Sequence, residues 1–228
     1  MKIHRKLAKL TRRETYRRAW RRAQRSIFRL PFEPVMANVD QTRLHEIQQR
    51  YAGEKYADVD HWLKVNRERV QDLKLHRVPP QRVLDLGCGG GFFLFILKRF
   101  NHSVLGLDID ESPLFRELVD VFGVPRTVFQ IQSFRPLPPL DQPFDWITAF
   151  SIGFDRDRAT NSRWGVREWD FLLQDLQSRL APGGKIYLTV NPLPDGREYL
   201  TRELREFFRS RGADIERERI FFKHGFLR

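Results

Sequence analysis

The residues best suited to chemistry lie in one short stretch, with Asp85, Gly87, Gly89 and Gly91 at alternate positions and Asp108 21 residues after Gly87. Glycines let a backbone turn tightly and come close to a ligand. Sites for a dinucleotide pyrophosphate favour the spacing G-x-G-x-x-G, whereas position 92 here is Phe and an acid precedes the first glycine. Because a carboxylate repels a pyrophosphate, the stretch favours a ligand with a cationic amino-acid end. Asp108 occupies the usual place of a carboxylate that accepts hydrogen bonds from a ribose diol.

The neighbouring elements predict how this stretch is held. Val83 and Leu84 end a short apolar run that is typical of a buried parallel strand, and residues 93–100 are expected to form a helix. The glycines then join a strand to a helix N-terminus, as in the first half of a Rossmann-type βαβ unit. Residues 103–108 predict the next strand, with Asp108 at its carboxyl end.

The pattern resembles the class I S-adenosylmethionine-dependent methyltransferases. Their first motif is typically V-L-D-L-G-C-G-x-G, and their second strand typically ends in G-x-D. Residues 144–147 resemble the fourth motif of that family, and residues 181–185 resemble the turn that it usually writes L-x-P-G-G. The resemblance covers about residues 80–226. It implies a transferase, namely a methyltransferase, with S-adenosyl-L-methionine as cofactor and no metal.

The resemblance and the order of elements predict an α/β fold. We expect a Rossmann-like, doubly wound seven-stranded sheet, its last strand antiparallel and short, with an N-terminal helical extension. The later strands are expected at 128–131, 144–150, 186–190 and 215–222, which leaves 225–228 for the seventh. The expected division is a basic amphipathic helical arm at 1–30, a linker and helical cap at 31–78, and the methyltransferase domain at 79–228.

The resemblance also assigns residues to the cofactor. Asp85 and the glycines are expected at the methionine end, and Asp108 at the ribose. Family members often carry an acid after the third strand that contacts the adenine amino group, but here Gln132 or Ser133 would have to accept that hydrogen bond, with Phe134 stacked on the ring. The expected cofactor-binding set is Asp85, Gly87, Cys88, Gly89, Gly91, Asp108, Ile109, Gln132, Ser133, Phe134 and Phe150.

The acceptor is specified less clearly. Methyl transfer from a sulfonium is an in-line displacement, so a general base is needed only for a hydroxyl or a protonated amine. A long polar segment follows the fourth strand, at the end of the sheet where α/β enzymes bind their ligands. Asp155 in this segment is the candidate base, with Trp164 or Trp169 as pocket walls, and an exposed salt-bridged loop is the alternative. The mixed charge favours a small hydroxylated acceptor, such as a sugar- or lipid-linked molecule.

Two other functions stay open. One is an RNA methyltransferase that holds phosphates with its basic arm, and the other is a non-catalytic binding module that keeps the cofactor fold. The N/D-P-P-Y/F stretch typical of enzymes that methylate nucleobase amino groups is missing after residue 150. The single cysteine, Cys88, lies in the glycine loop, which argues against pyrimidine methylation through a cysteine adduct.

The charge is concentrated in the arm. The net charge is +12, and residues 1–30 hold 12 Lys and Arg against one acid, so the remaining residues are close to neutral. An apolar stripe runs along the arm at helical spacing, consisting of Tyr16, Trp20, Ala23, Ile27 and Leu30. Such a helix suits an anionic membrane face, RNA phosphates, or packing on its own body. A transit peptide is a further alternative.

The composition indicates the cellular compartment and the classes of site that the sequence does not predict. The sequence contains no run of 18 apolar residues that would predict a membrane span. One cysteine cannot form an internal disulfide and fits a reducing compartment, and the six histidines show no zinc-binding spacing. We expect a cytoplasmic protein, peripheral at a membrane if the arm binds lipid.

The charge distribution generates the first test. Deleting residues 1–30 should abolish salt-sensitive binding to RNA or anionic liposomes, because most of the net charge is removed. Affinity for S-adenosylhomocysteine should be unchanged by calorimetry. A truncated protein that binds RNA equally well would show that the body, not the arm, carries the binding.

Overall fold

The computed structural model describes residues 19–20, 23, 36–141, 143–157, 162–193 and 196–223. Nearly all of the basic arm lies outside the described residues, as does the stretch 225–228 that was expected to hold the seventh strand. The expectations for the arm therefore remain predictions.

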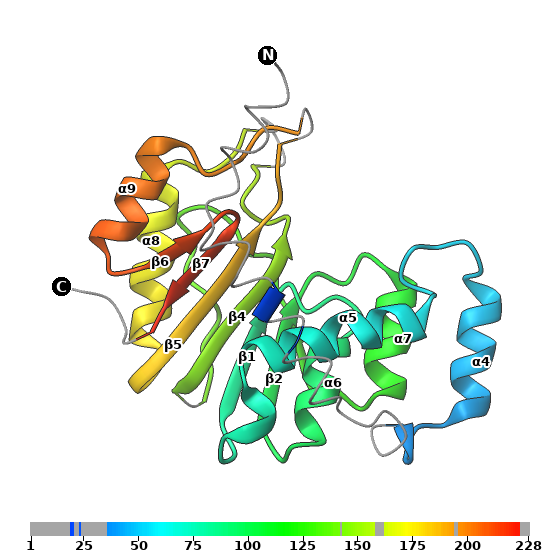
Figure 1. The fold of residues 1–228 in the computed structure, drawn as a ribbon. Helices are drawn as coiled ribbons and strands as arrows, with labels where there is room; N and C mark the ends of the chain where they lie inside the picture. The colour runs from blue at the N-terminus through cyan, green and yellow to red at the C-terminus, as the bar shows by residue number, and fades with distance from the viewer. Residues whose placement is uncertain are drawn as a thin grey trace.

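Seven strands form one mixed sheet in the order β3-β2-β1-β4-β5-β7-β6 (Figure 1). The first five strands are parallel, β7 is antiparallel to β5, and β6 is antiparallel to β7. The strands are β1 (Arg82–Leu86), β2 (Ser103–Asp108), β3 (Arg126–Val128), β4 (Phe144–Ile152), β5 (Leu180–Val190), β6 (Asp214–Glu216) and β7 (Arg219–Phe222). This arrangement confirms the Rossmann-like seven-stranded fold.

Helices cover both faces of the sheet (Figure 1). One face carries α4 (Gln41–Arg50), α5 (Val59–Asp72), α6 (Phe92–Lys98) and α7 (Pro113–Val121), with a short 3-10 turn at Leu75–Arg77. The other face carries α8 (Val166–Ser178) and α9 (Arg202–Ser210). Neighbouring strand residues serve different cores, since Val83 packs under the first group and Leu84 under the second. This alternation is what a sheet covered on both faces requires.

The end of the sheet differs from the expectation. Residues 215–222 are not one strand but the hairpin of β6 and β7, joined by a two-residue turn at Arg217 and Glu218. Arg217 has φ of 55° and is not a glycine, so the turn carries no ordinary sequence signal. The seventh strand is therefore 219–222 rather than 225–228. The third strand also lies earlier than expected, at 126–128 rather than 128–131, because these residues pair with the carboxyl end of β2.

The expected helical cap packs closely on the rest of the chain. Arg50 in α4 forms an ion pair of 2.7 Å with Glu117 in α7, and the Tyr51 hydroxyl donates to the same carboxylate at 2.7 Å. Leu63 and Val70 of α5 belong to the same core as Phe95 of α6. The cap and the sheet thus share one core, and the domain boundary at residue 79 stays a prediction.

The topology of the sheet predicts where a ligand binds. The chain leaves β1 toward β2 on one side, whereas β4 and β5 lie on the other. In open α/β sheets, ligands bind in the crevice at the carboxyl ends of the strands where the order reverses in this way. The glycine loop follows β1 at this point.

Candidate active site

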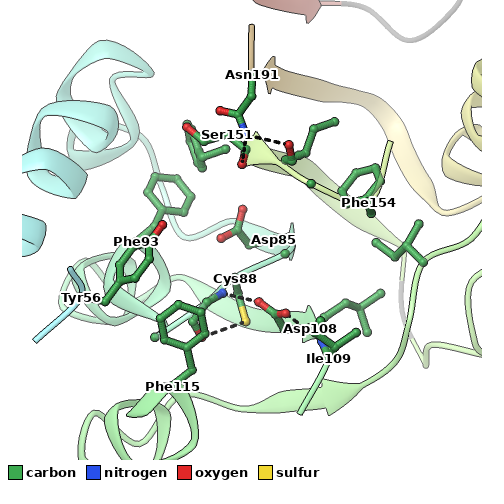
Figure 2. A pocket seen from close by; sticks show the side chains of 18 of the residues that line it. Tyr56, Asp85, Cys88, Phe93, Asp108, Ile109, Phe115, Ser151, Phe154 and Asn191 are labelled. Carbon is green, nitrogen blue, oxygen red and sulfur yellow. Dashed lines mark hydrogen bonds between the residues drawn. The ribbon is translucent and has the colours of Figure 1, made fainter. Parts of the chain in front are cut away.

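A cavity of about 940 Å³ lies at the carboxyl ends of β1, β2 and β4. This volume is near the upper end of the range typical of ligand sites, roughly 300–1,000 Å³. Figure 2 shows Asp85, Cys88 and Asp108 at its base, with Tyr56 and Phe115 on one side and Phe154 on the other. The expected residues that line it are Asp85, Gly87, Cys88, Gly89, Asp108, Ile109, Gln132, Ser133 and Phe150.

The glycine loop is fixed to β2. The amide groups of Gly87 and Cys88 both donate to the Leu107 carbonyl, at 2.7 and 3.2 Å. Gly87 has φ of 73°, and a Cβ added there would meet no atom within 4 Å, so the positive φ, not crowding, requires glycine at this cavity wall. Gly91 lies outside the cavity lining and instead starts α6 with φ of 74°. Burial raises the pKa of the Cys88 thiol, which agrees with a small residue that fills the turn.

Asp108 is held at the edge of the cavity. One carboxylate oxygen accepts a hydrogen bond from the Gly89 amide, and the other accepts from the Ile109 amide at 2.7 Å. Burial raises the pKa of Asp108, and these two amides oppose that rise. Each oxygen keeps a second lone pair. The carboxylate is thus rigid and still able to accept from a diol.

Asp85 is the most deeply buried acid of the cavity, with 3% of its surface exposed. The Thr148 hydroxyl donates to Oδ1 at 2.7 Å. Burial raises the pKa of Asp85 to about 7, the Thr148 hydrogen bond and the positive charge of Arg69 lower it, and Asp108 raises it further. A cation bound beside Asp85 would favour the carboxylate form.

Arg69 is a site residue that the sequence analysis missed. Its guanidinium lies 4.4 Å from the centre of the Phe150 ring and donates to Asn66 Oδ1 at 2.9 Å. Among the described residues, no carboxylate forms an ion pair with it, whereas the buried Arg126 and Arg163 each bind one. Burial lowers the pKa of Arg69. Arg69 is partly buried and lines the cavity, and a partly desolvated cation of this kind favours an anionic partner.

A sequence signal for Arg69 does exist. The buried stripe of α5 contains Leu63, Asn66 and Val70, so a polar residue interrupts an otherwise apolar face. Arg69 follows Asn66 by three positions and therefore lies next to it on the helix. Polar residues on the inner stripe of a cap helix could have indicated the site.

The adenine side is partly as expected. Gln132 and Ser133 line the cavity, together with the apolar residues Ile109 and Phe129. Phe134 does not line it. Its backbone has φ of 56°, its side chain is 49% exposed, and its ring lies 5.8 Å from that of Phe171. The structure therefore offers Phe129 rather than Phe134 as the aromatic wall.

Asp155 does not reach the cavity, which corrects its assignment as the base. It is fully buried, and its Oδ1 accepts from the Arg163 guanidinium at 2.5 Å. Its Oδ2 has no hydrogen-bond partner among the described residues. The alternative of an exposed salt-bridged loop is correct for the salt bridge with Arg163 and wrong for the exposure, because Asp155 is fully buried. Burial raises the pKa of Asp155 to about 6, while Arg163 lowers it. Arg156 and Asp157 line the cavity in its place.

Only one of the two tryptophans expected as pocket walls, Trp164 and Trp169, lines the cavity. Trp164 lines the cavity, whereas Trp169 is buried behind it and donates to the Tyr199 hydroxyl at 2.7 Å. That hydroxyl in turn donates to the Trp164 carbonyl at 2.7 Å. Trp164 is thus the expected pocket wall.

Within the described ranges, no group of three His, Cys, Asp or Glu residues is arranged to hold a metal ion. A search of the same residues for a helix with the length and apolar character needed to cross a membrane finds none.

Residues 83–184 match a family model described as a methyltransferase domain. The chain is 27% identical over 148 residues to phosphoethanolamine N-methyltransferase 3 of Arabidopsis thaliana, a match that covers 61% of this chain and 28% of that protein. It is 23% identical over 127 residues to a tRNA U34 carboxymethyltransferase of Campylobacter jejuni, covering 54% and 40%. The matches therefore span well under half the length of these relatives.

Solved structures of methyltransferases are also similar to part of the chain. An amino pentose methyltransferase from Micromonospora echinaspora, solved with bound S-adenosylmethionine, is 25% identical with a TM-score of 0.42, covering 67% of this chain and 58% of that one. A glycopeptide N-methyltransferase complexed with sinefungin is 20% identical with a TM-score of 0.41, covering 63% and 59%.

The sheet order and the family match define a class I methyltransferase domain with a Rossmann-like fold. Residues 83–184 thereby resemble the class I S-adenosylmethionine-dependent methyltransferases, an enzyme class whose cofactor is S-adenosyl-L-methionine.

The cavity fits this cofactor. The guanidinium of Arg69 would bind the methionine carboxylate, and Asp85 would bind the ammonium. Asp108 would accept hydrogen bonds from the ribose diol. The adenine base would lie between Ile109 and Phe129. The charges at the methionine end are thus paired by the ligand rather than by the protein alone.

The pKa of Asp85 generates a pH prediction. Because the folded carboxyl binds a proton below about pH 7, affinity for S-adenosylhomocysteine should rise by about tenfold from pH 6 to pH 8 and then level off. Calorimetry in buffers of different ionisation enthalpy should detect proton release near pH 7. Asp85→Asn should weaken binding at pH 8 and remove the trend. A wild-type affinity that does not vary with pH would place the ammonium elsewhere.

Asp155 generates a stability prediction. Its folded pKa is raised, so the group favours the folded state less as pH rises from about 4 to about 6, and the loss is complete above that range. Asp155→Asn, which cannot ionise, should therefore be more stable than the wild type at pH 8. The gain should shrink toward pH 4 in urea unfolding. Loss of stability at pH 8 would mean that the pair with Arg163 outweighs the burial of charge.

Proposed function

We propose that this chain transfers a methyl group from S-adenosyl-L-methionine to a small hydroxylated acceptor, such as a sugar- or lipid-linked molecule. The observation that carries the proposal is the continuity of one cavity. It joins the charged residues suited to the cofactor, Asp85 and Arg69, to a polar rim formed by Ser151, Arg156 and Asp157. A cavity of this volume has room for an acceptor beside the cofactor.

In the reaction, the chain itself would position the cofactor and the acceptor and would exclude water from the reacting atoms. When bound, the cofactor supplies an activated methyl group on a sulfonium. Asp85 and Arg69 would hold the methionine end of the cofactor, and Asp108 would hold its ribose. Effective positioning of this kind contributes several kcal/mol to a displacement, roughly 7–11 in well-oriented cases.

The cap provides an aromatic wall. The Tyr56 ring lies 4.5 Å from that of Trp62 and 4.9 Å from that of Phe115. All three line the cavity, and their apolar faces keep water from the reacting atoms. The cap helices would thus serve the acceptor as well as the cofactor, consistent with a cap at 31–78 and a catalytic domain at 79–228.

The proton balance points to Asp157. In the proposed reaction the acceptor oxygen bonds to the methyl carbon as the carbon–sulfur bond breaks, and the bonding pair stays on sulfur. The hydroxyl proton must pass to a base. Asp155 is fully buried and does not line the cavity, and no histidine is found among the described lining residues. Asp157 is therefore the candidate base, because its carboxylate lies at the acceptor rim.

An RNA acceptor is the second candidate. It is favoured by the 12 Lys and Arg of residues 1–30 and by the similarity of residues in this chain to a protein named as a tRNA carboxymethyltransferase. The same arm would suit an anionic membrane face, with the enzyme cytoplasmic and peripheral. A non-catalytic module is less favoured, because Asp85 and Arg69 would then remain buried without a ligand to pair them.

The direct test is calorimetric titration of S-adenosylhomocysteine into the full-length protein. We expect one site per chain with a micromolar dissociation constant, because the charged and diol-binding groups are already in place. Labelled S-adenosylmethionine then tests transfer to polyols, amino sugars and RNA in parallel. Absence of binding in a protein that is folded by circular dichroism would favour the non-catalytic module.

A further inference from the structure

β4 ends in a strained residue at the cavity. Ser151 has φ of 53°, a left-handed conformation that costs energy for a residue with a side chain. The pairing of β4 with β5 shifts register between Ala149 and Ile152, which marks a β-bulge. Bulges often re-aim side chains beside active sites.

Side chains at the end of β5 hold this conformation. The Ser151 amide donates to the Thr189 hydroxyl at 2.7 Å. The Asn191 side-chain amide donates to the carbonyls of both Ser151 and Ile152, each at 2.9 Å (Figure 2). Both backbone groups of Ser151 are thus satisfied. Its exposed hydroxyl has no hydrogen bond within the described part of the chain and is available to a ligand.

Ser151 lies at the junction of two cavities. A second cavity of about 330 Å³ shares Arg69, Phe150, Ser151 and Asn191 with the larger one. Its remaining walls come from the end of α5, from β5 and from the β6–β7 turn. A molecule in the second cavity could therefore reach the place where the methyl group is expected.

The charges of the second cavity favour a cation. The Arg219 guanidinium lies 4.0 Å from the Asp72 carboxylate, so these two offset each other. Arg69 is committed to the cofactor carboxylate under the proposed function. The carboxylate of Glu218 also lines the cavity and has no ion pair with another described residue. Hydroxyl and amide groups of Ser151, Thr189 and Asn191 complete a polar lining.

We propose that the acceptor site extends from the larger cavity into the second one, that the second cavity takes the ammonium of a small amino alcohol or amino sugar toward Glu218, and that Ser151 positions the reacting hydroxyl at the junction. Ser151 is a positioning residue in this scheme, and Asn191 and Thr189 hold it in place. The proposal rests on the methyltransferase function and adds the class of acceptor.

The test uses full-length protein saturated with S-adenosylhomocysteine, so that failure of the cofactor site is detected separately. Glucosamine and ethanolamine are the probes, with glucose and ethylene glycol as uncharged counterparts, and binding is measured by saturation-transfer NMR. The amines should bind about fivefold or more tightly than their counterparts, as expected for one partly desolvated ion pair. Equal binding, or no binding of either amine to the saturated protein, would overturn the proposal.

Two variants locate the effect. Glu218→Gln should abolish the preference for the amines, whereas Glu203→Gln on the exposed start of α9 should leave it unchanged. Ser151→Ala should weaken all bound probes by about fivefold through loss of one hydrogen bond, with the affinity for S-adenosylhomocysteine unchanged. If Glu218→Gln keeps the amine preference, the ammonium is bound elsewhere and the assignment is wrong.

The backbone strain at Ser151 allows the role of its hydroxyl in binding to be tested separately from a structural role. Ser151→Gly should raise the melting temperature, by about 2–4 °C if roughly 1 kcal/mol of strain is released, and should still weaken the probes. Asn101→Gly, at φ of 60° in the loop before β2 and away from both cavities, is the matched control that should raise the melting temperature and leave probe binding intact. A Ser151→Gly variant that binds the probes as well as the wild type would contradict the role of the hydroxyl.

Discussion

The joint between β1 and β2 is the constraint on which the site depends. The Leu107 carbonyl accepts from two amides of the glycine loop, and the Asp108 carboxylate accepts from a third. These bonds fix the loop without any side chain of its own, so the cavity wall is backbone and can be approached closely. The same bonds commit Asp108 to one orientation. A ligand that uses Asp108 thus meets a group whose entropy has already been lost on folding.

Buried charge is the second theme of the molecule. Arg163 and Arg179 bind carboxylates within the protein, and each pair fixes a loop that follows or precedes a strand. Among the described residues, Arg69 and Asp85 form no close ion pair, although the charge of each acts on the pKa of the other across the cavity. A ligand that places opposite charges beside these two residues would therefore increase the stability of the folded protein.

The parts that could be predicted from sequence are those that local chemistry decides. The glycine loop and Asp108 were predicted because positive φ demands glycine and because the strand–loop–helix pattern places the acid. Arg69 was missed because its importance comes from what α5 packs against, and Asp155 was misassigned because nothing in a polar segment shows that one of its acids is sealed by Arg163. The fold class was predictable, but the β6–β7 hairpin was not, since its turn contains Arg217 and Glu218 rather than glycine or asparagine.

The lengths of the outermost strands have a consequence for association between chains. The two edges of the sheet are β3 and β6, and each has only three residues. A short edge presents few unpaired amide and carbonyl groups, so it is a poor template for a strand from another molecule. The sheet is thus guarded against edge-to-edge growth, and contacts between copies of this chain would have to form through helices or loops.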